Sequence, residues 1–369
     1  MSRLALLCAL LAGACSGGEK KPQDPAGGSG APGSGSGGSA GPGSGGSSNG
    51  SSGSNGSSAL AEPALPPAPP LPDVPAGLPP APANPAITPE AVALGELLFW
   101  DTRLSITNLM SCATCHLPEQ GFAGAARQDT AAGKPNLRRA PALANLAWQK
   151  ELGWDGRFAA LNLQLAMHVR GQLGGDLADA VARISDVPGY RPHFARAGGA
   201  TADTALAALA AYISTRYEGG APWDRLERAP DVPAELKAGY LLFTGRAQCA
   251  VCHTPPLYTD QRYHRLGLIK SPDDGRGLVD ARQQGAFKTP TLRGAASRAA
   301  FFHDGCAETL DAAIDWHLAG GTGQGADRSI IDPALRKLAL SAAERAQLGA
   351  FVRALTDTTA SVPRKPALP

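Results

Sequence analysis

The sequence is poor in the features that mark several large classes of protein. Its 369 residues carry a formal net charge of only +2, so it lacks the basic surface by which a nucleic-acid-binding protein attracts phosphates. No apolar run reaches the roughly 18 residues that a membrane-spanning helix needs, which argues against an integral membrane protein. Aromatic residues make up only 5% of the chain and there are three methionines. We predict that Met110 and Met167 are core residues.

Large apolar residues are also scarce along a long stretch near the N-terminus. Residues 16–58 are almost entirely Gly, Ser, Ala, Pro, Asn and Lys, and residues 62–85 are dominated by Pro and Ala. Such stretches bury too little apolar surface to offset the entropy lost on ordering them. We predict a disordered tether over residues 16–85, flexible in its Gly/Ser part and stiffer and extended in its Pro-rich part.

The first 15 residues have the pattern of an export signal. Arg3 precedes an apolar run over residues 4–12, and small residues lead to Cys15. This resembles a short bacterial lipoprotein signal with Cys15 as the lipidated residue, and the alternative is an ordinary secretory signal cut near the same point. Either signal exports the chain. Ser16 after Cys15 favours the outer membrane, so we predict a periplasmic protein that contacts the membrane only through its lipid.

Cysteine spacing indicates covalently bound haem. Four of the seven cysteines lie in two C-x-x-C-H motifs, formed by Cys112, Cys115 and His116 and by Cys249, Cys252 and His253. Two thiols at this spacing can form thioethers with one haem, and the adjacent histidine is then placed under the iron. Zinc is the alternative, but a histidine joined to each pair suits a site of four thiolates poorly. We predict two haem c groups, and we interpret Cys306, which belongs to neither motif, as a small buried residue.

Apolar periodicity predicts a mainly α fold. The expected helices cover residues 89–100, 159–170, 177–184, 204–217, 234–243, 309–319 and 341–356. No convincing alternation extends beyond four or five residues, so extended sheet is not expected. Leu-Leu-Phe ends the helix before each C-x-x-C-H motif, at residues 97–99 and 241–243. We predict two cytochrome c-like domains over residues 86–225 and 226–362, joined near residues 221–232.

Several segments between residues 94 and 319 resemble the bacterial di-haem cytochrome c peroxidase/MauG family. They are Leu-Gly-x-Leu-Leu-Phe-x-Asp-x-Arg-Leu-Ser at 94–105, Ala-Pro-Ala-Leu at 140–143, Trp-Asp-Gly-Arg at 154–157, Pro-Gly-Tyr at 188–190, Phe-Lys-Thr-Pro-Thr-Leu-Arg at 287–293, Phe-His-Asp-Gly at 302–305 and both haem motifs. The resemblance implies a periplasmic enzyme with a peroxide-reacting haem in its N-terminal domain. It also implies an electron-transfer haem in its C-terminal domain.

The first haem departs from part of this family pattern. No His or Met lies between His116 and Trp154, where many members carry a distal ligand, so the resemblance implies an iron open to peroxide. Gln164 matches the family's distal Gln, but Gly174 stands where a catalytic Glu is expected. His168 lies one turn beyond Gln164, on the helix face with Leu161 and Leu165. We consider three roles for His168: acid–base catalyst, sixth iron ligand, or a residue that only caps the helix or faces water.

At the second haem, the resemblance implies that His317 is the sixth ligand, where peroxidases have Met and MauG-type members have Tyr. His317 shares an apolar stripe with Leu310, Ala313 and Ile314, so a core histidine is the alternative. The resemblance also places Trp154 between the haems as an electron relay, with a purely structural core role as the alternative.

Four other basic residues are expected to lie close to the haems. His303 is interpreted as structural and close to the second haem, and Arg246 and Arg293 as candidates to pair with haem propionates. Family members often bind calcium through an Asn at the position of Arg139. A cation there makes calcium doubtful as a cofactor.

The sequence therefore favours a peroxidase that reduces hydrogen peroxide to water. Electrons would come from a small donor protein, either a cytochrome c or a cupredoxin. Two alternatives remain open: a MauG-like enzyme that oxidises a side chain of a partner protein, and a non-enzymatic electron-transfer protein. The oligomeric state is open between a monomer and a homodimer.

Overall fold

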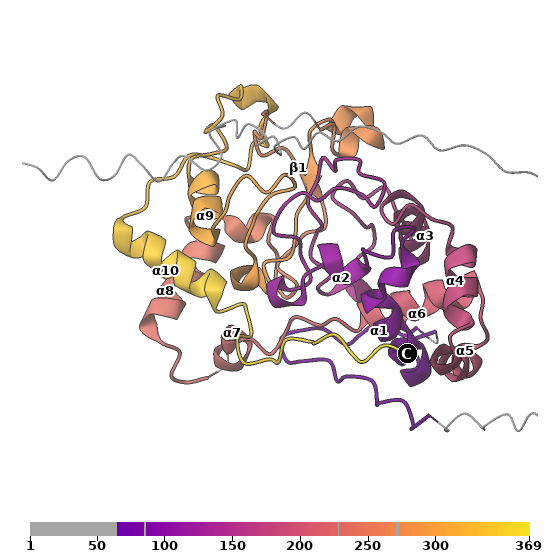
Figure 1. Ribbon diagram of the computed structural model, residues 1–369. Coiled ribbons are helices and arrows are strands. Elements are labelled where there is room, and N and C mark those ends of the chain that lie inside the picture. The colour runs from indigo at the N-terminus through magenta and orange to yellow at the C-terminus, as the bar shows by residue number, and fades with distance from the viewer. Residues whose placement is uncertain (1–64, 85, 228, 271–272) are drawn as a thin grey trace, which may run out of the picture. The chain divides into compact units, whose positions relative to one another are not determined.

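The computed structural model describes residues 65–84, 86–227, 229–270 and 273–369. The predicted signal, the predicted lipidation site at Cys15 and the Gly/Ser-rich part of the predicted tether lie outside these residues. The described part is mainly helical, as expected (Figure 1). None of its helices combines the length and the apolar composition that crossing a bilayer requires.

The first haem motif lies among helices α1 to α6. Their bounds are α1 Pro89–Trp100, α2 Cys112–Cys115, α3 Leu161–Gly171, α4 Leu177–Ser185, α5 Arg191–Ala197 and α6 Ala202–Ser214. Helix α1 begins as the sequence predicts, because Thr88 Oγ1 accepts a hydrogen bond from the Ala91 amide and Pro89 fills the first position. Helices α1 and α6 cross closely, since a Cβ on Gly95 would lie 1.9 Å from the Ala208 carbonyl oxygen.

The second haem motif lies among α7 Pro222–Leu226, α8 Ala234–Thr244, α9 Leu310–Leu318 and α10 Ala342–Arg353. Helices α8 and α10 pack together as α1 and α6 do. A Cβ on Gly239 would lie 2.1 Å from the Gln347 carbonyl oxygen, so glycine again permits the close crossing. Phe243 and Phe351 are fully buried at this crossing, with ring centroids 5.0 Å apart. Each haem motif thus has its own helix pair and hydrophobic core.

The internal repeat extends beyond the Leu-Leu-Phe ending seen in the sequence. Isolated bridges pair Leu152 with Phe158 and Phe301 with Ala307, so Trp-Asp-Gly-Arg and His-Asp-Gly-Cys occupy equivalent loops. Two reciprocal backbone hydrogen bonds join these loops to the other half. The Arg139 amide donates to the His303 carbonyl at 2.9 Å, and the Lys288 amide donates to the Trp154 carbonyl at 2.8 Å. Trp154 and His303 are therefore equivalent residues at the boundary between the two halves.

Strand structure is slight in the described residues. The strands β1 Tyr263–His264 and β2 Phe287–Lys288 pair antiparallel, with Tyr263 opposite Lys288.

Two helices differ from the predicted ones. The expected helix at 204–217 is shifted, because Thr201 caps α6 and the last helical residue of α6 is Ser214. Helix α5 was not expected, since its seven residues are too few to show periodicity.

The Pro-rich stretch is more ordered than expected. Residues 65–84 have no regular helix or strand, but basic and indole side chains of the folded region bind its carbonyl groups. Arg196 Nη1 donates to Pro66 O at 2.6 Å, Arg293 Nη2 to Gly77 O at 2.6 Å and Trp148 Nε1 to Pro80 O at 3.1 Å. Proline has no amide hydrogen, which leaves nearby carbonyl groups free to accept from other segments. Residues 65–84 are extended, as predicted, but they are bound to the folded region and are not part of a disordered tether.

The predicted junction at 221–232 contains α7, whose Trp223 is buried. Two smaller expectations need correction. Met167 is 50% exposed and Cys306 is only half-buried, although both were expected to be buried. Met110 packs against the first core as predicted.

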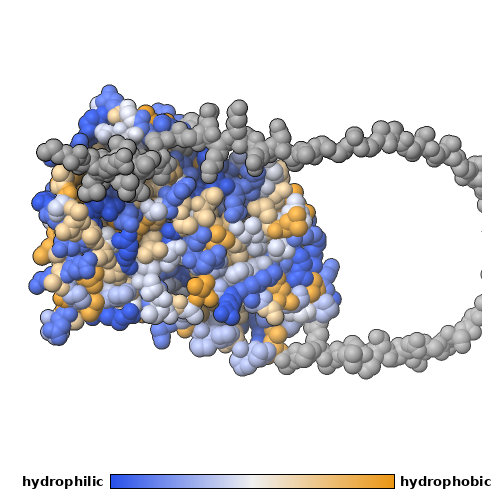
Figure 2. Space-filling view, turned by 60° about the vertical axis from the view of Figure 1, so that its left-hand side comes forward, coloured by the Kyte–Doolittle hydropathy of each residue, from blue (hydrophilic) through white to orange (hydrophobic). Residues whose placement is uncertain are grey.

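On the face in Figure 2, apolar and hydrophilic residues are intermixed. Single exposed apolar side chains are ordinary on a protein surface.

Candidate haem sites

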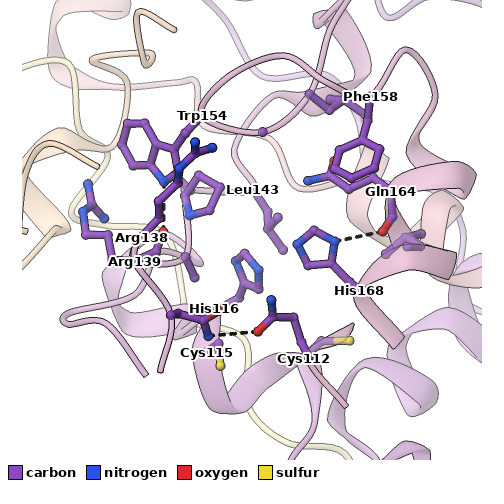
Figure 3. A pocket seen from close by; sticks show the side chains of 18 of the residues that line it. Cys112, Cys115, His116, Arg138, Arg139, Leu143, Trp154, Phe158, Gln164 and His168 are labelled. Atoms are coloured by element: carbon purple, nitrogen blue, oxygen red, sulfur yellow. Dashed lines mark hydrogen bonds between the residues drawn. The ribbon is translucent and has the colours of Figure 1, made fainter. Parts of the chain in front are cut away.

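The first C-x-x-C-H motif opens onto a cavity of about 670 Å³ (Figure 3). Cys112, Cys115 and His116 line one side, and helix α3 lines another. The motif forms the short helix α2, in which the Thr114 hydroxyl accepts from the Ser111 amide at 2.9 Å. Burial raises the pKa of the Cys112 thiol to about 12. Both thiols and the histidine therefore face one cavity, as attachment of a single haem requires.

His116 has the hydrogen bonding of an iron ligand. Its Nδ1 donates to the Phe122 carbonyl at 2.9 Å, which leaves the Nε2 lone pair free. Burial lowers the pKa of His116 to about 4, so its imidazole is neutral. A neutral imidazole oriented by a backbone carbonyl is the usual proximal ligand of haem iron.

Helix α3 presents its predicted face to the same cavity. Leu161, Gln164, Leu165 and His168 all line it. His168 Nδ1 donates to the Gln164 carbonyl at 2.8 Å, so Nε2 carries the free lone pair. Figure 3 shows the rings of His168 and His116 directed toward one another. Burial lowers the pKa of His168, which keeps it neutral and able to accept a proton.

The position expected to hold a catalytic carboxylate favours glycine. Gly174 adopts a left-handed conformation with φ +76°, and a Cβ there would lie 2.8 Å from Ile106 Cδ1. The carboxylate two residues further on, Asp176, caps helix α4 by accepting from the Ala178 amide. The region expected to supply a carboxylate therefore holds an aliphatic side chain and a capping residue.

The two carboxylates that line the described part of this cavity, those of Asp155 and Asp273, are both held by arginine. Arg138 donates to Asp155 at 2.7 Å and to both oxygens of Asp273 at 2.6 Å, and Arg157 also binds Asp155. Burial alone raises the pKa of Asp155, but the arginine hydrogen bonds lower it overall. Both carboxylates are therefore ionised and paired, which leaves His168 as the better proton acceptor.

The second C-x-x-C-H motif lines a separate cavity of about 430 Å³. Cys249, Cys252 and His253 face it, and so does the predicted stripe of helix α9, which consists of Leu310, Ala313, Ile314 and His317. His253 Nδ1 donates to the Tyr258 carbonyl at 3.1 Å, and burial lowers the pKa of His253 to about 4. The proximal arrangement of the first site is thus repeated.

His317 lies opposite His253. The ring centroids are 6.3 Å apart, and His317 Nδ1 donates to the Ala313 carbonyl at 2.8 Å. An ion bound by two imidazole nitrogens, each at about 2 Å, separates the ring centroids by about 6 Å. Both imidazoles are neutral, since burial also lowers the pKa of His317. The pair therefore fits one iron with two histidine ligands.

His264 is a residue near this site that the sequence reasoning missed. Its Nδ1 lies 2.7 Å from Asp332 and its Nε2 lies 2.9 Å from Asp260. Cys252, Asp260 and His264 have the spacing of a metal cluster. Because Cys252 belongs to the haem motif, this cluster is part of the haem site. No local sequence pattern joins His264 to Asp332, which lies 68 positions away.

Trp154 lies in the wall shared by the two cavities. It lines both, it is buried, and its Nε1 donates to the Arg139 carbonyl at 2.9 Å. Arg139, Lys288 and Arg298 also line both cavities. His303 lines the second cavity, as expected for a residue close to the second haem.

The assignment of Arg293 to a haem propionate is wrong. Its guanidinium is fully buried and forms two hydrogen bonds to Asp224, at 2.8 and 2.9 Å. It also donates to the Pro256 and Gly77 carbonyls, and it lines neither of the two cavities. Arg246 does line the second cavity, where it is exposed and paired with Glu344.

A mainly helical chain with two such cavities, each bearing a C-x-x-C-H motif, belongs to the class of di-haem c-type proteins. A family model described as "Di-haem cytochrome c peroxidase" matches residues 89–230. The chain is 36% identical over 302 residues to the methylamine utilization protein MauG of Methylorubrum extorquens, covering 78% of this chain and 84% of that protein. It is 32% identical over 333 residues to the cytochrome-c peroxidase IdrP1 of Denitromonas iodatirespirans, covering 79% and 88%.

Solved structures agree with this assignment. A crystal structure of a MauG-like protein associated with microbial copper homeostasis superposes with a TM-score of 0.71 at 26% identity, covering 78% of this chain and 95% of that one. The di-haem peroxidase BthA of Burkholderia thailandensis, at 21% identity and a TM-score of 0.61, supports the fold. The chain belongs to the di-haem cytochrome c peroxidase/MauG family and is an oxidoreductase of the cytochrome-c peroxidase type. The family implies two c-type haems.

Proposed function

We propose that this protein reduces hydrogen peroxide to water with electrons from a small redox protein, either a cytochrome c or a cupredoxin. The observation that carries the proposal is the neutral imidazole of His168, which faces His116 in the larger cavity with its Nε2 free. Haem held by Cys112, Cys115 and His116 supplies the iron that reacts with peroxide. The surrounding residues must move protons, carry electrons and exclude bulk water.

His168 is the proposed acid–base catalyst. Splitting the peroxide O–O bond to yield water requires a group that takes a proton from one oxygen and returns it to the leaving oxygen. The hydrogen bond from Nδ1 to the Gln164 carbonyl fixes the tautomer, so Nε2 is the atom that gains and loses the proton. The side chain of Gln164 lines the same cavity and is the proposed second polar contact for peroxide.

Trp154 is the proposed electron relay. His253 and His317 would hold the second haem, which would take up electrons with little reorganisation because both ligands are strong. The indole borders both cavities, and its hydrogen bond to Arg139 fixes its orientation. A buried aromatic ring in this position shortens the path between the two sites.

The location of the protein follows from the same proposal. We place it in the periplasm, attached to the outer membrane by a lipid on Cys15, where a soluble donor protein can reach it. Expression with radiolabelled palmitate tests the lipid, and Cys15→Ser is expected to abolish labelling. Release of the Cys15→Ser protein from the membrane fraction would support the anchor.

A MauG-like role is the second candidate, in which the oxidising equivalents modify a side chain of a partner protein. Two observations favour it: the similarity to MauG proteins over more than three quarters of the chain, and the histidine at position 317 instead of the Met of many peroxidases. Both roles use the first cavity for peroxide and differ in where the electrons come from.

Peroxide consumption by the intact two-haem protein with reduced cytochrome c distinguishes these roles. Sustained turnover that depends on the donor supports the proposed peroxidase. An oxidised optical spectrum that persists for minutes without donor, together with negligible turnover, supports the MauG-like role. A spectrum that does not respond to peroxide contradicts both and favours simple electron transfer.

A further inference from the structure

Three basic side chains are buried in the wall between the cavities. Arg139, Lys288 and Arg298 are 4%, 7% and 9% exposed. Burial lowers their pKa values, to about 9 for Arg139, about 8 for Lys288 and about 10 for Arg298. Among the residues that the structure describes, none of the three forms a salt bridge with a carboxylate. A buried cation that no carboxylate binds directly is costly, so this wall favours the binding of an anion.

The hydrogen bonds of these cations are made to neutral groups. Arg139 Nε donates to the Phe302 carbonyl at 2.7 Å and Nη1 to the Gly124 carbonyl at 3.2 Å. Arg298 donates through Nη1 and Nη2 to the Thr291 and Arg293 carbonyls, at 2.9 and 2.7 Å. Its Nε is buried without any partner among the described residues.

Lys288 is different. Its Nζ donates to Gln149 Oε1 at 2.8 Å and also to the Glu151 carbonyl, so two of its three donors are already used. Arg139 and Arg298 are therefore the cations best able to bind an anion.

His303 lies in the same wall and lacks hydrogen-bond partners for its ring nitrogens. It is 1% exposed, and both ring nitrogens are buried without a hydrogen-bond partner in the described structure. Its ring stacks on Phe287 with centroids 3.7 Å apart and planes 9° apart, which fixes the imidazole at the edge of the second cavity. Buried ring nitrogens are rarely left unpaired, so a partner is missing here.

The neighbouring acidic side chains form no salt bridge with either arginine. Asp273 is held by Arg138, and Asp304 interacts electrostatically with Arg139 while its Oδ1 accepts from the Cys306 amide at 3.1 Å. Glu218 interacts electrostatically with Arg298, but it forms no salt bridge with it, and burial raises the pKa of Glu218. No carboxylate of the described polypeptide is thus hydrogen-bonded to Arg139 or Arg298, and haem carries two carboxylates on its propionate side chains.

We propose that Arg139, Arg298 and His303 form one carboxylate-binding site in the shared wall, which holds haem propionates. Arg139 and Arg298 border both cavities and serve both haems, whereas His303 serves the second haem alone. Guanidinium groups suit this task because they bind carboxylates through two parallel hydrogen bonds. The site also couples the haems to Trp154, whose indole donates to the Arg139 carbonyl.

This inference goes beyond the peroxidase proposal and holds equally for the MauG-like role. A propionate paired with arginine is neutralised, and loss of the arginine leaves a negative charge beside the iron. Negative charge favours the oxidised iron and lowers its midpoint potential. The potentials of the two haems therefore test the site without any measurement of peroxide activity.

The test uses the intact two-haem protein and optical redox titration. Arg298→Gln is expected to lower the midpoint potentials of both haems, and His303→Phe to lower that of the second haem only. Arg336→Gln is the matched control, because Arg336 lines the second cavity but is exposed to solvent, where its charge is screened. Haem content is measured in each variant by denatured haem spectra.

Unchanged potentials in Arg298→Gln with both haems attached would overturn the site. If Arg298→Gln does not fold, resonance Raman spectra of the unmodified protein and of His303→Phe decide the question. A shift of the propionate bending band in His303→Phe supports the hydrogen bond, since phenylalanine keeps the stacking on Phe287 but has no donor. Identical bands in the two proteins refute it.

Discussion

His253 and His317 face each other with their ring centroids 6.3 Å apart. Each donates its Nδ1 hydrogen to a backbone carbonyl, so two Nε2 lone pairs are available for one ion between the rings. His116 and His168 repeat this hydrogen bonding in the first cavity. The two sites therefore have the same arrangement of histidines. Their different functions must depend on His168 in the first cavity and on His317 in the second.

Haem stoichiometry tests the two attachment sites. Denatured protein is expected to retain two haems, because thioether bonds survive denaturation. Replacing Cys112 and Cys115 with Ala should remove one haem, and replacing Cys249 and Cys252 should remove the other. Pyridine haemochrome spectra give the count, and Cys306→Ala is the matched control that should keep both haems. A chain that contains zinc and no haem would refute the assignment.

The His317→Ala variant tests the sixth ligand of the second haem. Loss of the imidazole removes one of the two strong-field ligands, so the second haem should change from low spin to high spin or to water ligation. Electron paramagnetic resonance of the ferric protein separates the signals of the two haems. The His193→Ala variant, which changes a histidine outside both cavities, is the control. An unaltered low-spin signal in His317→Ala would show that His317 is only a core residue.

Replacement of Trp154 by Phe tests the electron relay. Phenylalanine preserves an aromatic ring in the wall but is much harder to oxidise and cannot donate to Arg139. Donor-dependent peroxide turnover should fall at least about tenfold, while reduction of the second haem by the donor keeps its rate. Rapid-mixing spectroscopy measures both steps. Equal turnover in Trp154→Phe and the unmodified protein would limit Trp154 to a structural role.

Asp101 provides a test of stability. Its buried carboxylate accepts from Tyr190 Oη at 2.7 Å and from Arg103. Burial raises the pKa of Asp101, but these hydrogen bonds lower it overall. The ion therefore stabilises the fold above its ordinary pKa of 3.8, and this contribution is lost as the pH falls through the lower folded-state pKa. Asp101→Asn should cost about 2 kcal/mol at neutral pH.

Urea unfolding at pH 7 measures this effect. Asp280→Asn is the control, because Asp280 pairs with Arg282 on the surface and its loss should leave the unfolding midpoint nearly unchanged. An equal effect of the two substitutions would contradict the account of Asp101.

Much of the helical framework could be predicted from local sequence. The cap at Thr88, the apolar faces of α3 and α9 and both haem motifs depend on residues close together in the chain. Their positions in the structure agree with the predicted faces. The assignment to the di-haem family is likewise confirmed by the comparisons.

Long-range partners could not be predicted in the same way. Arg293 looked free for a propionate because its partner, Asp224, lies 69 positions away. The Pro-rich stretch was expected to be part of a disordered tether because the side chains that bind its carbonyls come from distant parts of the chain. The sequence also gives no sign that Ile106 covers Gly174, since that contact joins two separate loops.

In the proposed function, His168 moves protons for peroxide in the first cavity. Its pKa is lowered by burial, so the rate of reaction with peroxide should fall only as the pH drops through a value below the ordinary 6.5, where the imidazole gains a proton and ceases to be a base. A fall of the rate near or above that ordinary value would indicate a different base.

The most direct measurement is the stopped-flow rate of reaction of the two-haem protein with peroxide in His168→Ala. Acid–base assistance is worth about a hundredfold or more, so the rate should fall by at least that factor while haem content and the His116 ligand remain normal. His168→Glu should recover part of the rate, because a carboxylate can replace the imidazole as a base. An unchanged rate would contradict the account, and a faster rate would show that His168 blocks the iron as a ligand.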